Sequence, residues 1–397
     1  MVDKPHATQS TPTTHLSIVV PFYNATKNSQ RLLATLRTLT QPWIELVFVD
    51  DGSTDETYEM LAEFSKQCEL PVVLLRQENG GPGKARNSGI RCSKGEYVWL
   101  VDCDDDIDIA AIAEFHRLRP EGFDFIDFDM LNVSPSNTMG LDFGRHRNSP
   151  ELRPRLLGGY GALCTKITRR ELFIKNDVWY PDHCFYEDNA LSLIWPFYVH
   201  TFYKSELTAY IHLMDFASVT RQRVTVRYFD RLRTAAWGYS IARKLATTPE
   251  DVAAAENRFI DLYLTKTTAQ IFGMSYPDTG FFSSLKSRRY AEAASKMVKH
   301  FGSLWYLRSW LQSARVHRHF REITRDIDLV AHPLGRTKNL DLKSRIRLRA
   351  VWFTSFVLPS QLRYFRQLSE RAWPSREMYG SWIEPRMPNT ASTLIGN

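Results

Sequence analysis

Four carboxylates lie within five consecutive residues, Asp102, Asp104, Asp105 and Asp106. Only Cys103 interrupts this acidic run. Like charges this close repel one another, so we expect a cation to neutralise them. Carboxylates without neighbouring His or Cys favour a hard divalent ion, which keeps open positions for the phosphates of a substrate. The run therefore predicts a Mn²⁺ or Mg²⁺ site that receives a phosphate compound. The alternative is a solvated acidic turn that caps the next helix.

A glycine-rich stretch, NGGPGKARN at residues 79–87, carries two positive charges after its glycines. It is not a P-loop, since Ala85 follows Lys84, and it is not a dinucleotide-binding motif, since Arg86 stands where the third glycine belongs. A helix that begins here offers an anion its positively polarised end and the charges of Lys84 and Arg86. We interpret the stretch as an anion-binding loop, and the alternative is an ordinary turn.

Apolar runs and amphipathic stretches alternate around these motifs. Apolar, β-branched runs predict buried strands, and apolar residues at helical spacing predict helices. The predicted strands cover 16–21, 45–50, 72–75, 97–102 and a half-exposed 123–130, and the predicted helices cover 30–39, 55–66, 83–92 and 110–118. This alternation predicts an α/β fold, a doubly wound parallel sheet with helices on both faces. Ligands of such sheets bind at the carboxyl ends of the strands, so the acidic run and the glycine-rich stretch should meet there.

The overall composition is that of a globular protein. The chain has 397 residues, of which 43% are hydrophobic and 24% charged, and this excludes a mostly disordered or collagen-like chain. No apolar run reaches the roughly 18 residues that span a bilayer, and the first fifteen residues lack the apolar core of a secretory signal. Five cysteines without a CxxC pair argue against a disulfide framework or structural zinc, and they favour a reducing cytoplasm.

The positive charge is concentrated late in the chain. Residues 281–372 hold 19 Lys and Arg against 6 Asp and Glu, interleaved with aromatic residues. Such a segment suits an anionic membrane surface; the alternatives are an ordinary helical domain with a basic face, or a nucleic-acid or protein partner. We predict a disordered tail at 1–15, a sheet domain over 16–225, a basic, aromatic-rich helical domain over 226–372 and a polar tail at 373–397.

Four motifs follow one another in the order SIVVPFYN, VDDGSTD, ENGGPGKARNSGI and WLVDCDDD. Together they resemble the donor half of family 2 glycosyltransferases over residues 16–106, and a weaker resemblance extends to about residue 222. The resemblance implies the GT-A fold, a doubly wound mixed sheet with helices on both faces, with an acceptor half over 107–225. It also implies a metal-dependent enzyme that uses a nucleotide sugar.

The resemblance implies which residues bind the nucleotide part of the donor. Pro21 and Tyr23 would line the base and the ribose. Asp51 would accept a hydrogen bond from the base, typically uracil. Lys84 and Arg86 would lie along the rest of the donor.

The segment WLVDCDDD contains the metal-binding DxD pair of the family. By resemblance, Asp104 would bind the metal, Asp102 would lie near the ribose and the metal, and Cys103 would serve as a small residue rather than a nucleophile. His212 belongs to a segment that resembles the part closing over the diphosphate. It would complete the metal shell or bind phosphate, and the alternative is a packed or exposed histidine.

Residues 185–191, FYEDNAL, resemble the ED motif on the acceptor side. By resemblance, Asp188 would be the catalytic base that takes a proton from the acceptor hydroxyl, and one direct displacement would invert the anomeric carbon. We expect Asp188 to be desolvated beside Glu187, with a raised pKa. The alternative is that Asp188 caps a helix that follows it.

The resulting hypothesis is an inverting, metal-dependent glycosyltransferase in the cytoplasm, on the inner face of the cell membrane. We expect it to use a UDP-sugar donor and a glycan or lipid-linked acceptor, in cell-surface polysaccharide synthesis. The alternative is a catalytically inactive GT-A-like protein that docks through its basic helical part.

Overall fold

The computed structural model describes residues 13–131, 141–158, 163–213, 230–260, 262 and 382–387. The predicted basic segment, 281–372, lies outside the described residues. Within the described part, no helix combines the length and the apolar character that crossing a membrane requires.

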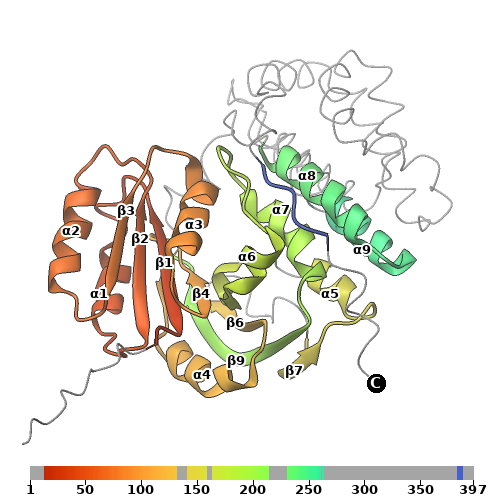
Figure 1. The fold of residues 1–397 in the computed structure, drawn as a ribbon, viewed down its shortest axis with the longest axis horizontal. Helices are drawn as coiled ribbons and strands as arrows, with labels where there is room; N and C mark the ends of the chain where they lie inside the picture. Colours follow the sequence, from red (N-terminus) through yellow and green to blue (C-terminus); the bar gives the residue numbers. More distant parts are fainter. Residues whose placement is uncertain are drawn as a thin grey trace, which may run out of the picture.

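A nine-stranded mixed sheet forms the centre of the described structure, with strand order β3-β2-β1-β4-β8-β6-β9-β5 and β7 paired to β9 (Figure 1). Its strands are β1 (Leu16–Phe22), β2 (Ile44–Asp50), β3 (Val72–Arg76), β4 (Tyr97–Leu100), β5 (Asp106–Ile107), β6 (Phe125–Leu131), β7 (Gly144–Arg147), β8 (Lys166–Arg169) and β9 (Thr201–Ile211). The strands β3, β2, β1 and β4 are parallel, as predicted. The sheet becomes mixed at β8, which is antiparallel to both β4 and β6.

Helices cover both faces of the sheet. They are α1 (Gln30–Arg37), α2 (Thr57–Gln67), α3 (Gly81–Cys92), α4 (Ala110–Leu118), α5 (Arg153–Gly158), α6 (Glu171–Asn176), α7 (Glu187–Ile194), α8 (Asp230–Leu245) and α9 (Pro249–Ile260). The helices α1, α2 and α4 contribute to the core on one face, and α3, α6 and α7 contribute to the core on the other. The four helices predicted between the first strands are confirmed as α1 to α4.

Helix α3 lies unusually close to the sheet. A Cβ atom added at Gly89 would stand 2.3 Å from a methyl group of Val19 on β1, so only glycine fits at this contact. The close contact fixes α3, whose first turns carry Lys84 and Arg86, against the first strand.

The strand predicted as half-exposed is β6. The strand is confirmed, but the predicted exposure is wrong, since most of its residues are buried. Asp127 on this strand is 0% exposed, because it pairs with two equally buried lysines, Lys166 at 2.8 Å and Lys204 at 3.0 Å. The alternation of polar and apolar residues therefore does not mark a solvent face here. It marks a buried ionic group between β6, β8 and β9.

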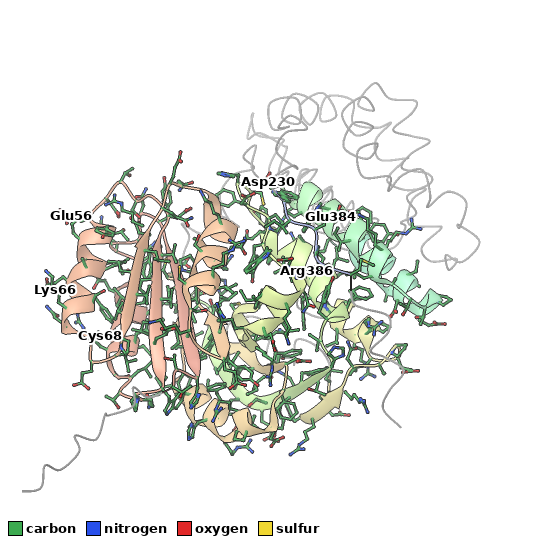
Figure 2. All side chains as sticks on the ribbon, viewed as in Figure 1. Glu56, Lys66, Cys68, Asp230, Glu384 and Arg386 are labelled. Atoms are coloured by element: carbon green, nitrogen blue, oxygen red, sulfur yellow. The ribbon has the colours of Figure 1, made fainter. Side chains whose placement is uncertain are left out.

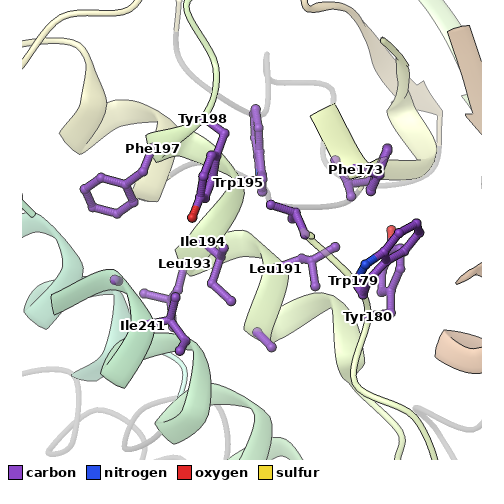
Figure 3. Close-up of a cluster of buried hydrophobic side chains, with 14 of the residues drawn as sticks. Phe173, Trp179, Tyr180, Leu191, Leu193, Ile194, Trp195, Phe197, Tyr198 and Ile241 are labelled. Carbon is purple, nitrogen blue, oxygen red and sulfur yellow. The ribbon is translucent and has the colours of Figure 1, made fainter. Parts of the chain in front are cut away.

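The core continues past the predicted domain boundary near residue 226. Helix α7 is buried nearly all round, and α8 packs against it. Ile241 of α8 lies in the same apolar cluster as Leu193 and Ile194 of α7 (Figure 3). A helix that is apolar on every side needs cover on every side, so α8 joins the sheet domain. The predicted polar tail also differs, since Trp382 is 6% exposed and joins this cluster.

Candidate active site

Arg86 connects the two motifs that sequence analysis singles out on the two halves of the chain. Its guanidinium lies 2.5 Å from the carboxylate of Asp102, at the end of β4, and also contacts the carboxylate of Glu187, the first residue of α7. Burial lowers the pKa of Arg86, but Asp102 and Glu187 outweigh it and hold the pKa well above its ordinary value. The DxD segment and the ED motif therefore share one cation.

Two of the acidic residues are engaged in holding the loop itself. Asp106 pairs with Arg31 of α1 at 2.7 Å. Asp105 accepts hydrogen bonds from the Tyr210 hydroxyl at 2.7 Å and from the backbone N–H of Leu213 at 2.9 Å. These contacts tie the acidic run to the end of β9.

Asp104 differs from its neighbours, since no described residue forms an ion pair with it. It is half-buried, and burial together with the charges of Asp102 and Asp105 raises its pKa to about 6. Among the described residues there is no group of three or more His, Cys, Asp and Glu arranged to hold a metal ion. The described residues thus provide one carboxylate without an ion-pair partner, that of Asp104. They do not form a complete set of protein ligands for a metal ion.

His212 lies beside the acidic run, next to Asp105. Its Nδ1 atom is 2.9 Å from the Asp105 carboxylate, and this hydrogen bond raises the pKa of His212. Cys103, between the two residues of the DxD pair, has its pKa raised by burial and by the adjacent carboxylates. A half-buried thiol that keeps its proton is a poor nucleophile, which agrees with the interpretation of Cys103 as a small residue.

Asp51 closes the glycine-rich loop onto the end of β2. Its carboxylate accepts hydrogen bonds from the Gln77 side chain at 2.7 Å and from the backbone N–H groups of Gly80 at 3.0 Å and Gly81 at 2.8 Å. Burial raises the pKa of Asp51, although these hydrogen bonds oppose the shift. Gly81 starts α3 with φ +83°, a conformation that glycine adopts at little cost. Lys84 reaches back to the carbonyl of Glu78 at 3.3 Å.

The end of β1 presents an aromatic ring to the solvent. Pro21 is buried in β1, whereas Tyr23 is 50% exposed. The next residue, Asn24, accepts a hydrogen bond from the backbone N–H of Thr54 at 2.8 Å. This contact joins the loop after β1 to the loop after β2. An exposed ring on a fixed loop can stack on a planar ligand.

The ED motif begins α7, and its two carboxylates lie in different environments. Glu187 is buried, and burial raises its pKa to about 7 even though Arg86 opposes the shift. Asp188 is exposed, and among the described residues its carboxylate accepts only a local hydrogen bond, from the N–H of Asn189 at 3.0 Å. The predicted desolvation of Asp188 is therefore wrong, because the helix start turns Glu187 inward and Asp188 outward.

Sequence reasoning missed the segment that brings the ED motif to the glycine-rich loop. Asn87 of α3 donates to the carbonyl of Tyr180 at 2.8 Å and accepts from its N–H at 3.0 Å. A Cβ atom added at Gly83 would stand 2.2 Å from the carbonyl oxygen of Pro181. The backbone N–H of His183 donates to the Gly80 carbonyl at 2.7 Å. The only sequence signal for this close approach of α3 to residues 180–183 is the small size of α3 residues such as Gly83.

The first part of the chain matches a known family. Residues 17–117 match the family described as Glycosyl transferase family 2. The likeness to this family is limited to that part of the chain. The match contains the DxD segment and the glycine-rich loop, and it confirms the resemblance from which the site was predicted.

Two curated relatives match parts of this chain. The poly(ribitol-phosphate) beta-N-acetylglucosaminyltransferase TarS of Staphylococcus aureus is 32% identical over 178 residues, which cover 42% of this chain and 29% of TarS. A poly(ribitol-phosphate) beta-glucosyltransferase of Bacillus spizizenii is 38% identical over 109 residues, 27% of this chain and 17% of that protein. This chain spans less than a third of the length of these relatives.

The fold is shared with a solved structure. Residues 1–349 of S. aureus TarS, crystallised in complex with UDP, match with a TM-score of 0.50 and 20% identity, over 87% of this chain and 92% of that chain. At this identity the likeness shows the fold alone, and it confirms the predicted GT-A-type mixed sheet with helices on both faces.

Proposed function

We propose that this protein is an inverting, metal-dependent glycosyltransferase that moves a sugar from a UDP-sugar to a hydroxyl group of a glycan or lipid-linked acceptor. The observation that carries the proposal is the environment of the Asp104 carboxylate. It is half-buried beside two other carboxylates, and no described residue forms an ion pair with it. The match of residues 17–117 to family 2 supports the reaction class, and the UDP bound by TarS supports the choice of nucleotide.

The residues at the acidic run fit a divalent ion that is completed by its substrate. Mg²⁺ and similar ions are commonly held by one or two carboxylates plus substrate phosphates. Asp104 would supply the carboxylate and His212 a neighbouring ligand, whereas Asp102 is already paired with Arg86. When bound, such an ion stabilises the negative charge of a nucleoside diphosphate leaving group.

The chain's own residues would hold the donor at the carboxyl ends of the parallel strands. Tyr23 would stack on the base, and Pro21 would line the same site from β1. Asp51, which is buried at the end of β2, would accept from the base while it keeps the glycine-rich loop closed. Lys84 and Arg86, on α3, would lie along the rest of the donor.

Asp188 would act as the base of the transfer. It would remove the proton from the acceptor hydroxyl as that oxygen attacks the anomeric carbon, while the bond from this carbon to the diphosphate breaks. Attack opposite the leaving group inverts the anomeric carbon. The exposure of Asp188 supports this role, since an acceptor must reach it, and Glu187 would keep Arg86 in place behind it.

The acceptor and the location complete the proposal. The two relatives are named for poly(ribitol-phosphate), and they support a cell-surface polysaccharide as the product of this protein. The five cysteines, all free, support the cytoplasm as its compartment. Contact with the inner face of the membrane is proposed for residues 281–372, which lie outside the described residues.

Calorimetric binding of UDP, GDP and dTDP, each with and without Mn²⁺, tests the donor site. We expect UDP to bind wild type only with Mn²⁺, and Asp104→Asn to lose this binding. Asp108→Asn is the matched control, because Asp108 is exposed and its carboxylate accepts a hydrogen bond only from the N–H of Ala110 within the described part of the chain.

If no nucleotide binds, or if Asp104→Asn binds UDP as wild type does, the proposed donor site is wrong. If UDP binds, a screen of UDP-sugars for release of UDP identifies the donor.

A further inference from the structure

Residues 382–387 pack against the segment that leads into the ED motif. In Figure 1, residues 382–387 are the blue trace beside α7 and α8. Trp382 is 6% exposed, and its indole N–H donates to the carbonyl of Asp182 at 3.0 Å, across 200 positions of sequence. The same ring makes an edge contact with Trp237 of α8, with ring centroids 5.5 Å apart.

The other end of this segment is fixed to the end of α6. The backbone N–H of Arg386 donates to the carbonyl of Asn176 at 2.7 Å, and its guanidinium contacts the carboxylate of Asp177. The carbonyl of Arg386 accepts from the Tyr198 hydroxyl at 2.8 Å. Figure 2 shows Arg386 at this position, with Glu384 beside α8.

Residues 177–186, which start at the contact with Arg386 and run past Asp182 to the ED motif, have an unusual backbone. Asp177, His183 and Tyr186 have φ of 49°, 51° and 60°, in the left-handed region that residues other than glycine seldom adopt. Such residues persist where the surrounding structure holds them. Tyr186 is followed directly by Glu187 and Asp188, so the path of this backbone decides where both carboxylates lie.

Other contacts hold the later part of the same segment, from His183 to Tyr186. The N–H of His183 donates to Gly80 of the glycine-rich loop. The N–H of Phe185 donates to the Asp230 carboxylate at 3.0 Å, and the Arg231 guanidinium lies over the Tyr186 ring at 4.2 Å. Residues 382–387 contact its earlier part, at Asp177 and Asp182.

We propose that residues 382–387 form a strap whose Trp382 and Arg386 are positioning residues for Glu187 and Asp188. The strap holds residues 177–186 in their left-handed turns, and thereby sets the start of α7 relative to the donor. The catalytic consequence rests on the proposed glycosyltransferase function, whereas the effect on the backbone of 177–186 does not.

Trp382→Phe in the full chain tests the strap, because phenylalanine keeps an aromatic ring beside Trp237 and removes the N–H donated to Asp182. We measure hydrogen–deuterium exchange in peptides covering 177–189, and kcat and the donor KM for the UDP-sugar found by the screen. A lost hydrogen bond corresponds to roughly a fivefold change, so we expect exchange and kcat to change by about that factor. The donor KM should stay within about twofold, since Asp182 and Trp237, which Trp382 contacts, are not among the residues proposed to bind the donor.

Arg386→Met provides a second, independent variant, because it removes the contact with Asp177 and leaves Trp382 intact. Ile383→Ala is the matched control in the same segment, since Ile383 is 44% exposed. It should change neither the exchange of 177–189 nor kcat.

Exchange in 177–189 that stays at the wild-type rate in both variants overturns the strap. So does faster exchange with an unchanged kcat, because the segment would then be held without any effect on the carboxylates. If wild type itself transfers no sugar, the proposed function fails. The exchange measurement then decides whether the strap holds 177–186, faster exchange supporting it.

Discussion

The guanidinium of Arg86 contacts the carboxylate of Glu187, although 101 positions of sequence separate the two residues. The other side of the same guanidinium holds Asp102, so α3 connects the end of β4 to the start of α7. A planar guanidinium can bond two carboxylates at once, which a lysine ammonium does less well. The geometry of the site therefore depends on one side chain that belongs to neither carboxylate motif.

Arg86→Lys should impair the site while keeping its positive charge. Breaking part of a buried charge pair costs about 3–5 kcal/mol when a partner is left uncompensated, and we expect a loss toward the lower end because the charge remains. Transfer should fall at least tenfold. Urea unfolding measures the stability, and release of UDP measures the turnover.

Arg91→Lys serves as its control, since Arg91 is exposed on the same helix and faces the Trp179 ring. It should change stability by less than about 1 kcal/mol. Arg86→Lys with wild-type turnover would contradict the bridging role.

Asp188→Asn should abolish most of the transfer without weakening donor binding. Loss of a general base typically costs about 10²–10⁴ in rate. Asparagine can still accept the hydrogen bond from the N–H of Asn189, and the exposed position makes a large loss of stability unexpected. Single-turnover transfer and UDP calorimetry check the two halves of the prediction, and near-normal transfer would mean that another group is the base.

The burial of Glu187 should make stability depend on pH around neutrality. Its pKa is raised to about 7 in the folded protein, above its ordinary value of 4.5, so the folded protein retains a proton that the unfolded chain releases. This contribution to stability is fully present below about pH 4.5, and it is lost as the pH rises through about 7.

Glu187→Gln removes that dependence, because glutamine does not titrate. The melting temperature of wild type relative to Glu187→Gln should therefore be higher at pH 5 than at pH 8. Thermal unfolding of both proteins at pH 5, 6, 7 and 8 gives the comparison. A difference that is constant with pH would show that Glu187 does not titrate in this range.

Gly83→Ala should separate α3 from the segment that leads into the ED motif. The added Cβ atom would stand 2.2 Å from the carbonyl oxygen of Pro181, so the backbone of one element must move. Overpacking of this kind costs about 1–3 kcal/mol, and turnover should fall because Arg86 lies one turn further along α3. Gly80→Ala is the comparison for stability, since its Cβ meets the flexible side chain of Lys84 instead.

The parallel half of the sheet could be predicted because local sequence determines it. Buried β-branched runs give β1 to β4, and the polar residues after each strand must then lie at one edge. The strands of the other half of the sheet were harder to predict from the sequence. In β9, Lys204 and Ser205 are fully buried, so alternation of polar and apolar residues does not reveal the strand.

The environments of Glu187 and Asp188 depend on contacts distant in sequence. Two adjacent carboxylates look alike in a sequence, and only the start of α7 and the position of Arg86 decide which one is buried. The packing of Trp382 against Trp237 and Asp182 is likewise a tertiary contact without a local pattern.

Asp127→Asn should destabilise the protein more than any single surface change. Burial alone would raise the pKa of Asp127, but Lys166 and Lys204 outweigh it and hold the pKa below its ordinary value. Removing the negative charge leaves two buried lysines without full compensation, and this costs about 3–5 kcal/mol. Urea unfolding at pH 7 measures the loss, with the exposed Asp108→Asn as the matched control. If Asp127→Asn unfolds within about 1 kcal/mol of wild type, Asp129, which lies 2.6 Å from Lys204, carries the compensation instead.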